Sequence, residues 1–277
     1  MLLAMDVGNT ETLIGLFGED GPDSPDAMGF ARASGEHGLA YHWRTATAAS
    51  RTPDEHAITL TQLLDLEGLD LRSAVSAIAV CSSVPSVTTQ LRRMAGRWFA
   101  DRPLTVLGPG TKSGMPILYE SPRDVGADRI ADAVGAYDLY PGALVVVDMG
   151  TATVFDVVSA DGEYLGGAIA PGVAISLEAL YAHASALRSV ELVRPRSAVG
   201  RSTAESIRSG VLYGFAAQID GMVERIWEEV GECTVIGTGG LASFIAPHTT
   251  HVGVVEPWLT LHGVRIVHER NHPKESP

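Results

Sequence analysis

An acidic turn motif that occurs twice constrains the fold of this chain more than any other feature of its sequence. Residues 6–10 read Asp-Val-Gly-Asn-Thr and residues 148–153 read Asp-Met-Gly-Thr-Ala-Thr. Each copy follows a run of apolar residues and precedes a second run that is typical of a β-strand. Because the copies lie about half the chain apart, we expect a duplicated α/β domain with a cleft between the two copies. The alternative is a chance repeat in a sequence with 30 glycines.

Periodicity and capping residues predict the elements around these turns. Thr52 and Ser202 are each followed three residues later by a glutamate, a pattern that begins α-helices. Residues 19–40, rich in Gly, Asp, Pro and Ser, predict an exposed loop or insertion, and residues after about 270 predict a frayed tail. Expected helices begin at residue 53 and cover 86–99, 128–140 and 203–230, and expected strands lead into each acidic turn and cover 11–17, 75–84, 104–107, 153–159, 164–169 and 234–238.

Composition excludes several classes of protein. The chain has 20 Lys and Arg against 33 Asp and Glu, so it lacks the basic surface of a general nucleic-acid binder. Cys81 and Cys233 stand alone, which disfavours a disulfide framework or a zinc knuckle and indicates two small buried hydrophobic side chains. No apolar run approaches the roughly 20 residues of a membrane helix, and the first residues lack the pattern of a signal peptide. We expect a soluble intracellular protein without a membrane partner.

The repeated turns have the chemistry of a phosphate site. A glycine lets backbone N–H groups approach a phosphate closely, and Asn9, Thr10 and Thr151 add side-chain hydrogen bonds. The aspartate of each turn repels phosphate but can hold a cation that bridges to it. Two such hairpins that face each other would bind the phosphate tail of a nucleoside triphosphate. The alternative for either aspartate is an Asx turn that caps its own backbone.

Residues 126–129, Gly-Ala-Asp-Arg, lie at the predicted start of a helix, with Tyr119 in the preceding loop. A helix N-terminus favours negative charge, so Asp128 could accept a proton from a substrate hydroxyl. Arg129 supplies a guanidinium that matches a carboxylate or a phosphate. The alternative is that Asp128 only caps the helix while Arg129 points to solvent.

Residues 237–240, Gly-Thr-Gly-Gly, follow a predicted strand near the end of the second half. Their small size would let an adenosine approach the backbone closely. The alternative, which we favour for this motif taken alone, is a strand-to-helix turn that needs a positive φ angle.

Several motifs follow one another along nearly the whole chain, and their order is more specific than any one of them. They are Asp6-Val7-Gly8-Asn9-Thr10, Arg51-Thr52-x-Asp54-Glu55, Ser82-Ser83-Val84-Pro85-Ser86, Gly108-Pro109-Gly110, Gly126-Ala127-Asp128-Arg129, Asp148-x-Gly-Thr-Ala-Thr, Gly166-Gly167-x-Ile169-x-Pro171-Gly172, Thr238-Gly239-Gly240-Leu241 and Glu269-Arg270-Asn271. In this order they resemble type III pantothenate kinases of the actin–hexokinase–heat-shock-ATPase superfamily. The resemblance implies an α/β fold of two duplicated ribonuclease-H-like domains of the actin/hexokinase type, with an interdomain cleft and with domains at residues 1–118 and 119–277.

The resemblance also implies a reaction and assigns its residues. ATP, accompanied by magnesium, would phosphorylate the primary hydroxyl of pantothenate to give 4′-phosphopantothenate, the first step of coenzyme A synthesis. Asp128 would be the general base, and Asp148 would bind a monovalent cation, potassium or ammonium. The chain would be a cytoplasmic homodimer in which the partner subunit helps to close the pantothenate pocket. The residues assigned to the nucleotide are Asp6, Val7, Gly8, Asn9, Thr10, Glu11, Thr12, Leu13 and Thr151, and those assigned to pantothenate are Tyr119, Gly126, Ala127, Asp128, Arg129 and Ala184.

Two positions depart from the family pattern. Ala184 stands where the family has a substrate-contacting threonine, unless Ser185 supplies the hydroxyl, and one lost hydrogen bond costs about 0.5–1.5 kcal/mol. Glu11 stands where the family often has asparagine, and its charge would weaken ATP binding unless it faces away or meets a cation. These departures leave two alternatives open: a nucleotide-binding regulatory protein of the same fold, or a kinase for another small hydroxy acid.

Overall fold

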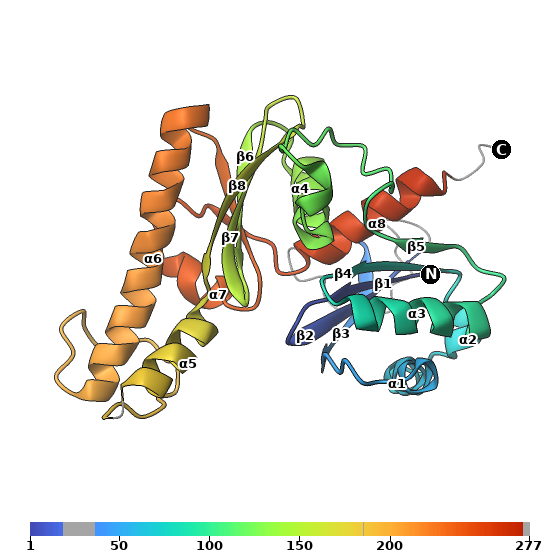
Figure 1. Cartoon of the computed structure of the whole chain (residues 1–277), viewed down its shortest axis with the longest axis horizontal. Helices are drawn as coiled ribbons and strands as arrows, with labels where there is room; N and C mark the ends of the chain where they lie inside the picture. Colours follow the sequence, from blue (N-terminus) through green and yellow to red (C-terminus); the bar gives the residue numbers. More distant parts are fainter. Residues whose placement is uncertain (19–36, 185, 274–277) are drawn as a thin grey trace. The chain divides into compact units, whose positions relative to one another are not determined.

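The computed structural model describes residues 1–18, 37–184 and 186–273, which form two compact units (Figure 1). Unit 1 comprises Met1–Asp138 and Trp258–Pro277, and unit 2 comprises Leu139–Pro257. The bounds of the two units differ from those of the predicted domains. The units are defined by which residues pack together, whereas the predicted domains follow the repeated motif. The domain boundary between residues 118 and 119 therefore stays a prediction.

Unit 1 is built on a mixed sheet of five strands in the order β3-β2-β1-β4-β5. The acidic turn of the first motif connects β1 to β2, which pair antiparallel with Asp6 opposite Leu13. Strand β3 extends this antiparallel meander, whereas β4 and β5 run parallel to β1. The strands are β1 Leu2–Val7, β2 Glu11–Phe17, β3 Leu39–Ala46, β4 Ala77–Ser82 and β5 Leu104–Val106.

Helices cover both faces of this sheet (Figure 1). On one face α1 and α3 bury Leu60, Leu91 and Met94 against strand residues such as Leu3 and Met5. Helix α8 packs against β1, β2 and β4 on the other face. The helical elements of unit 1 are α1 Pro53–Asp65, α2 Leu71–Ala74, α3 Pro85–Trp98, the 3-10 turn η2 Pro122–Asp124, α4 Ala127–Leu139 and α8 Leu259–Asn271.

Two glycines set the close crossing of α4 and α8. A Cβ at Gly263 would lie 1.8 Å from the carbonyl oxygen of Ala131, and a Cβ at Gly135 would lie 2.8 Å from the carbonyl oxygen of Leu259. Both distances are far below van der Waals contact, so the helix backbones pack directly on each other. The carboxyl-terminal helix is thereby fixed into unit 1.

Unit 2 repeats the topology of unit 1, with its strands in the order β10-β9-β6-β7-β8. Strands β6, β7 and β8 form an antiparallel meander, and β9 and β10 continue the sheet in parallel from β6. The second acidic turn connects β6 to β7, as the first connects β1 to β2. The predicted duplication is therefore confirmed. The strands are β6 Leu144–Met149, β7 Ala152–Val158, β8 Tyr164–Pro171, β9 Thr234–Thr238 and β10 Val254–Val255.

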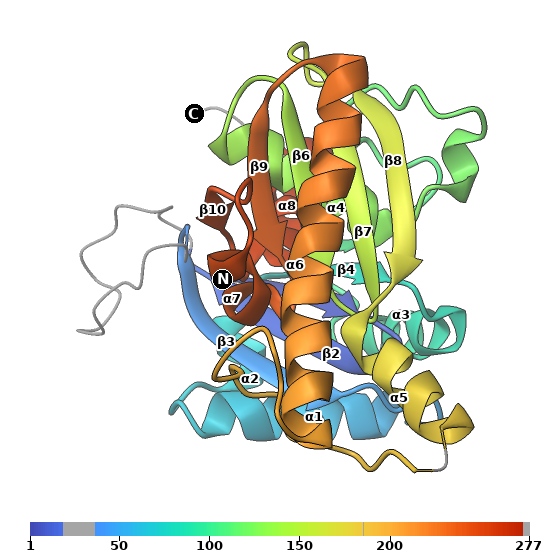
Figure 2. The ribbon, with the colours of Figure 1, turned by 90° about the vertical axis from the view of Figure 1, so that its left-hand side faces the viewer.

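Helix α6, the longest element of unit 2, lies across one face of its sheet (Figure 2). It buries Leu212, Ile219 and Val223 against strand residues that include Val145 and Phe155. The helical elements of this unit are α5 Val173–His183, α6 Thr203–Val230, α7 Ala242–Ile245 and the 3-10 turn η3 Ala246–His248. Within the described ranges, none of the helices combines the length and the apolar character needed to cross a membrane.

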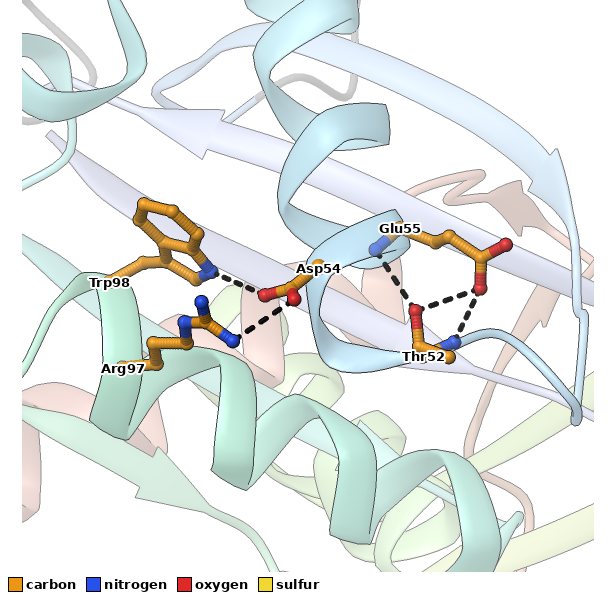
Figure 3. A network of polar contacts seen from close by, with 5 residues as sticks. All are labelled: Thr52, Asp54, Glu55, Arg97 and Trp98. Carbon is orange, nitrogen blue, oxygen red and sulfur yellow. Dashed lines mark hydrogen bonds and ion pairs between the residues drawn. The ribbon is translucent and has the colours of Figure 1, made fainter.

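The capping predictions are confirmed at α1 and half confirmed at α6. Thr52 accepts a hydrogen bond from the backbone N–H of Glu55, and the Glu55 carboxylate accepts one from the backbone N–H of Thr52 (Figure 3). Ser202 likewise accepts from the N–H of Glu205. The Glu205 carboxylate instead accepts from Arg196 and Arg208, so the reciprocal bond of a capping box is not made there.

Three predictions about element boundaries need correction or fall outside the described residues. Leu39 and Ala40 belong to β3, so the predicted loop over 19–40 was wrong at its end. Residues 19–36 lie outside the description, as do residues 274–277 of the predicted tail. Strand β4 covers Ala77–Ser82, a shorter range than the predicted 75–84, because Pro85 begins helix α3.

Candidate functional site

The first acidic turn is held rigid by one threonine from outside the hairpin. The backbone N–H of Gly8 donates to the carbonyl of Glu11 at 3.0 Å. The Thr47 hydroxyl donates to the Gly8 carbonyl at 2.7 Å, and the Thr47 N–H donates to the Thr10 carbonyl at 2.9 Å. Asn9 and Thr10 at the tip remain exposed. The turn is therefore a fixed and accessible array of backbone and hydroxyl groups of the kind that binds phosphate oxygens.

Glu11 at the start of β2 meets a cation. Its carboxylate lies 2.5 Å from a guanidinium nitrogen of Arg44 on β3, and both side chains are about half exposed. An exposed pair of this kind adds only about 0–1 kcal/mol of stability, but it offsets the negative charge next to the turn. Arg44 therefore reduces the electrostatic repulsion between Glu11 and an anionic ligand at the turn.

The second acidic turn places a carboxylate against glycine backbone. Asp148 is the penultimate residue of β6, and a Cβ at Gly239 would lie 2.2 Å from its Oδ1 atom. Gly239 has φ of +90°, as the turn interpretation of residues 237–240 predicted. A Cβ at Gly172 would lie 2.2 Å from the carbonyl oxygen of Thr151, whose oxygen accepts the Gly172 N–H at 3.1 Å. Only glycine fits these two positions, because the Asp148 carboxylate closely approaches Gly239 and backbone carbonyl oxygens closely approach Gly172.

The described residues around the second acidic turn offer few side chains for a metal held by protein alone. Among the residues that the structure describes, no group of three or more His, Cys, Asp or Glu side chains could hold a metal ion. A divalent ion held by protein alone commonly uses several carboxylates.

Asp128 lies in the first turn of α4, as predicted. Its Oδ1 atom accepts a hydrogen bond from the backbone N–H of Arg129 at 2.9 Å, so the carboxylate folds back over the helix start. A Cβ at Gly126 would lie 2.3 Å from the same oxygen. Glycine at position 126 therefore makes room for this carboxylate. The contact is compatible with both interpretations of Asp128, as a base and as a capping residue.

The Cys81 thiol shows which carboxylates of unit 1 share one neighbourhood. Cys81 is fully buried on β4 directly beside Asp6. Burial raises the pKa of this thiol, and the negative charges of Asp6, Asp128 and Asp132 raise its pKa further. The charges of Asp6 and of the predicted base Asp128 therefore act on the same buried thiol. Cys81 is the buried hydrophobic side chain that we predicted, whereas Cys233 is only partly buried.

The sequence analysis did not include Asp132 among the candidate site residues. It is only 3% exposed and lies four residues after Asp128, on the same face of α4. The spacing of four residues within a predicted helix was the signal that could have identified it.

A cavity of about 210 Å³ lies at the start of α4, wholly within unit 1. The loop at residues 108–110 forms one side, and Ala127 and Ile130 of α4 form another. Thr111, Ser113 and Arg123 provide polar groups in its wall. Tyr119, in the loop before α4, is 37% exposed. The cavity thus places a partly polar space beside the residue that precedes Asp128.

The predicted site residues fall in both units. Residues 6–13, Tyr119 and residues 126–129 belong to unit 1, whereas Asp148, Thr151 and Ala184 belong to unit 2. Ala184 follows α5 as its C-cap residue, and its N–H donates to the Leu180 carbonyl. The neighbouring residue 185 lies outside the described residues. The cleft and the joint binding of a triphosphate by both turns therefore stay predictions.

Comparisons with known proteins agree with the geometry. A family model described as Type III pantothenate kinase matches residues 2–225. The Type III pantothenate kinase of Streptomyces griseus subsp. griseus is 46% identical to this chain, and the match covers 98% of each chain. The Type III pantothenate kinase of Anaeromyxobacter sp. is 48% identical, and the match covers 98% of this chain and 100% of the relative. A solved structure of a putative 2-dehydro-3-deoxygalactonokinase from Sinorhizobium meliloti has a TM-score of 0.61 at 15% identity. The match covers 99% of this chain and 100% of that chain, and it supports the fold and nothing beyond the fold. The chain belongs to the type III pantothenate kinase family.

Proposed function

We propose that this chain transfers the γ-phosphate of ATP to the primary hydroxyl of pantothenate, giving 4′-phosphopantothenate and ADP in the first step of coenzyme A synthesis. The family match supports the reaction. We base the mechanism on Asp128 at the start of α4, because its negative charge and that of Asp6 in the first acidic turn both act on the buried Cys81 thiol. The pairing of Glu11 with Arg44 removes one reason to prefer a non-catalytic regulator.

The chain's own residues would bind, orient and deprotonate the substrates. The first turn, residues 6–13, would hold phosphate oxygens through backbone N–H and hydroxyl groups, with Thr151 assisting from the second turn. Asp128 would accept the proton of the pantothenate hydroxyl. The hydroxyl oxygen of pantothenate would bond to the γ-phosphorus as the bond from that phosphorus to the β–γ bridging oxygen breaks, and ADP would leave. Tyr119, residues 126–129 and the end of α5 at Ala184 would contact pantothenate. Magnesium bound with ATP would offset the charge of the phosphates.

We test the base by replacing Asp128 with asparagine. The amide keeps the size of the side chain but cannot take up the proton, so we expect the turnover number to fall by about 10²–10⁴-fold. A coupled assay of pantothenate-dependent ADP release measures the turnover. Asp124→Asn is the matched control, because this exposed carboxylate lies four residues before Asp128 and outside the predicted site. Near-normal turnover in Asp128→Asn would remove this residue from the role of base.

We also propose that Asp148 holds potassium or ammonium. The carboxylate and its glycine surroundings offer oxygen atoms with one negative charge. We expect activity to fall when sodium replaces potassium, because the smaller ion is held less well by a fixed set of oxygen ligands. We expect the Asp148→Asn variant to lose this cation dependence. If the wild-type rate is the same in sodium and in potassium, the assignment is wrong.

We propose a cytoplasmic homodimer, as the family resemblance implies, and exposed apolar side chains on unit 2 support the dimer. Ile175 and Leu180 of α5 are 39% and 40% exposed, and Ile169 of β8 is 64% exposed. Exposed apolar groups of this size commonly mark a protein interface. Light scattering should give the mass of two chains for the wild type and of one chain for Leu180→Glu. A monomeric wild type would refute the dimer.

A further inference from the structure

Arg51 is the residue of the motif Arg51-Thr52-x-Asp54-Glu55 whose side chain has no contact that explains its place in the structure. Thr52 and Glu55 form the cap of α1, and the Asp54 carboxylate accepts hydrogen bonds from side chains of α3 (Figure 3). Arg51 is partly buried, yet within the described residues its guanidinium makes no hydrogen bond and no ion pair. Taking a charged group out of water without a partner costs free energy. A ligand that pairs with this guanidinium would offset that cost.

Arginines that are buried to a similar degree, or that lie near the first acidic turn, have partners. Three of them are partly buried and contact a carboxylate: Arg102, Arg208 and Arg265. Arg44, beside the first acidic turn, is engaged by Glu11. The residues assigned to the nucleotide, 6–13 and Thr151, contain two acidic side chains and no lysine or arginine. A phosphate tail bound there would therefore be stabilised by a cation from outside this set.

Arg51 lines a small cavity next to the first acidic turn. The cavity has a volume of about 20 Å³ and lies wholly within unit 1. Its wall also includes Val7, the last residue of β1, and Thr12 near the start of β2, so it lies against both strands that the turn connects. Arg51 follows by four residues Thr47, whose N–H and hydroxyl hold the turn. Because the cavity is small, Arg51 lies close to the strands that carry the turn.

A second polar group of the same cavity has no partner within the described residues. His56 of α1 is only 9% exposed, and its Nε2 atom makes no hydrogen bond there. Burial, followed by the positive charge of Arg51, lowers the pKa of His56 to about 4, whereas the Glu55 carboxylate raises it. The imidazole is therefore neutral near pH 7, and the charge of Arg51 acts on it. Two polar groups without protein partners in one small cavity indicate a site that a ligand completes.

The charges around the cavity favour an anion. Among the described residues of its wall, Arg51 is charged, His56 is neutral near pH 7, and no aspartate or glutamate is present. The carboxylates nearest in sequence are engaged, Glu55 in the cap of α1 and Asp54 with α3. Asp6 does not line the cavity, although both of its neighbours along β1 do, because successive side chains of a strand point to opposite faces. The guanidinium of Arg51 is thus available to an anionic ligand.

We propose that Arg51 binds the phosphate tail of the nucleotide at the first acidic turn. Its planar guanidinium would donate hydrogen bonds to phosphate oxygens, a geometry that arginine matches well. His56 would reach the same anion through one water molecule, for which the cavity has room. The inference rests on the proposed function only for the binding of a nucleotide at residues 6–13, and it adds to that site the cation that those residues lack.

The test measures the affinity for ATP, ADP and adenosine by isothermal titration calorimetry, with magnesium present. Arg51→Gln should weaken ATP binding about 10–100-fold, because hydrogen bonds between a cation and an anion are lost. The same variant should leave adenosine binding unchanged, because adenosine has no phosphate. Arg51→Lys keeps the charge but loses the planar fork, so it should weaken ATP binding by a smaller factor, about 3–10-fold. Arg92→Gln is the matched control, since it removes the same charge at an exposed position of α3 outside the cavity, and its ATP affinity should equal that of the wild type.

Thermal unfolding separates a binding role of Arg51 from a structural one. Because its guanidinium contacts no described side chain or carbonyl, Arg51→Gln should unfold at the wild-type temperature when no nucleotide is present. With saturating ATP, the wild type should gain more thermal stability than Arg51→Gln does. If Arg51→Gln does not fold, the comparison of ATP with adenosine in Arg51→Lys carries the test.

The outcomes also separate this inference from the proposed reaction. A larger loss for ATP than for ADP assigns the contact to the γ-phosphate, and equal losses assign it to the phosphates that both share; either supports the inference. Wild-type ATP affinity in Arg51→Gln would overturn it, as would an equal loss of affinity for adenosine. A wild-type chain that binds ATP but releases no ADP with pantothenate would refute the proposed reaction and leave the role of Arg51 standing.

Discussion

Replacing Gly239 with alanine should destabilise unit 2 through two separable effects. Gly239 has φ of +90°, a conformation that costs a residue with a side chain about 1–3 kcal/mol. The added Cβ would also lie 2.2 Å from Oδ1 of Asp148 and 2.7 Å from the backbone nitrogen of Met149. Overpacking against backbone costs about 1–3 kcal/mol more. The sum, about 2–6 kcal/mol, is a large part of the 5–15 kcal/mol that stabilises a typical protein.

Gly231→Ala is the matched control for this prediction. Gly231 has φ of +85°, and nothing lies within 4 Å of the position of its Cβ. The control therefore carries the backbone cost without the overlap, and we expect Gly239→Ala to be less stable than Gly231→Ala by about 1–3 kcal/mol. Hydrogen-exchange mass spectrometry on β6 and β9 measures the free energy of opening in unit 2 for each variant. Equal losses in both variants would show that Asp148 does not pack against Gly239, and would refute the reasoning.

Two further predictions concern stability. Thr52→Ala should lower the free energy of unfolding of unit 1 by about 0.5–2 kcal/mol, because α1 loses its N-terminal cap. Thr52→Ser should retain the cap and the stability, and urea unfolding measures the stability of both variants. Burial lowers the pKa of His56, His262 and His268 to about 4, below the ordinary value of 6.5. Between these pH values the unfolded chain binds protons that the folded chain does not, so stability should fall as the pH is lowered from 6.5 towards 4, by up to about 1.4 kcal/mol per pH unit for each histidine. Unfolding curves at pH 7 and pH 5 that coincide would contradict this prediction.

The sequence predicted the duplicated turns well because glycine and aspartate have few uses at the end of a buried strand. Both hairpins, the strands that lead into them and the helices that begin at Pro53 and Thr203 were expected from local patterns. Asp128 was placed correctly at a helix start for the same reason, since residues 126–129 combine a glycine with acidic and helix-forming residues. Local rules suffice where neighbouring residues determine the conformation.

Helix α8 was missed because its sequence lacks a local helix signal, and strand β3 was missed although its sequence alternates. Helix α8 is buried almost all round, contains Gly263 and begins at Leu259, and its N-cap residue Trp258 makes no side-chain capping bond. It therefore shows neither an amphipathic period nor a start signal. Strand β3 alternates half-buried aromatic residues, Tyr41 and Trp43, with exposed polar residues, and the sequence analysis did not use this local pattern. The contact of Glu11 with Arg44 was beyond prediction, because it depends on the pairing of β3 with β2.

The position of α8 has a consequence for how the polypeptide is made. Unit 2 is continuous in sequence, but α8, which supplies Leu261, Val264 and Val267 as buried side chains to unit 1, follows it. On the ribosome, all of unit 2 emerges before this helix does. Until α8 emerges, one face of the sheet that carries the first acidic turn stays uncovered. Unit 1, which is synthesised first, therefore completes its folding last.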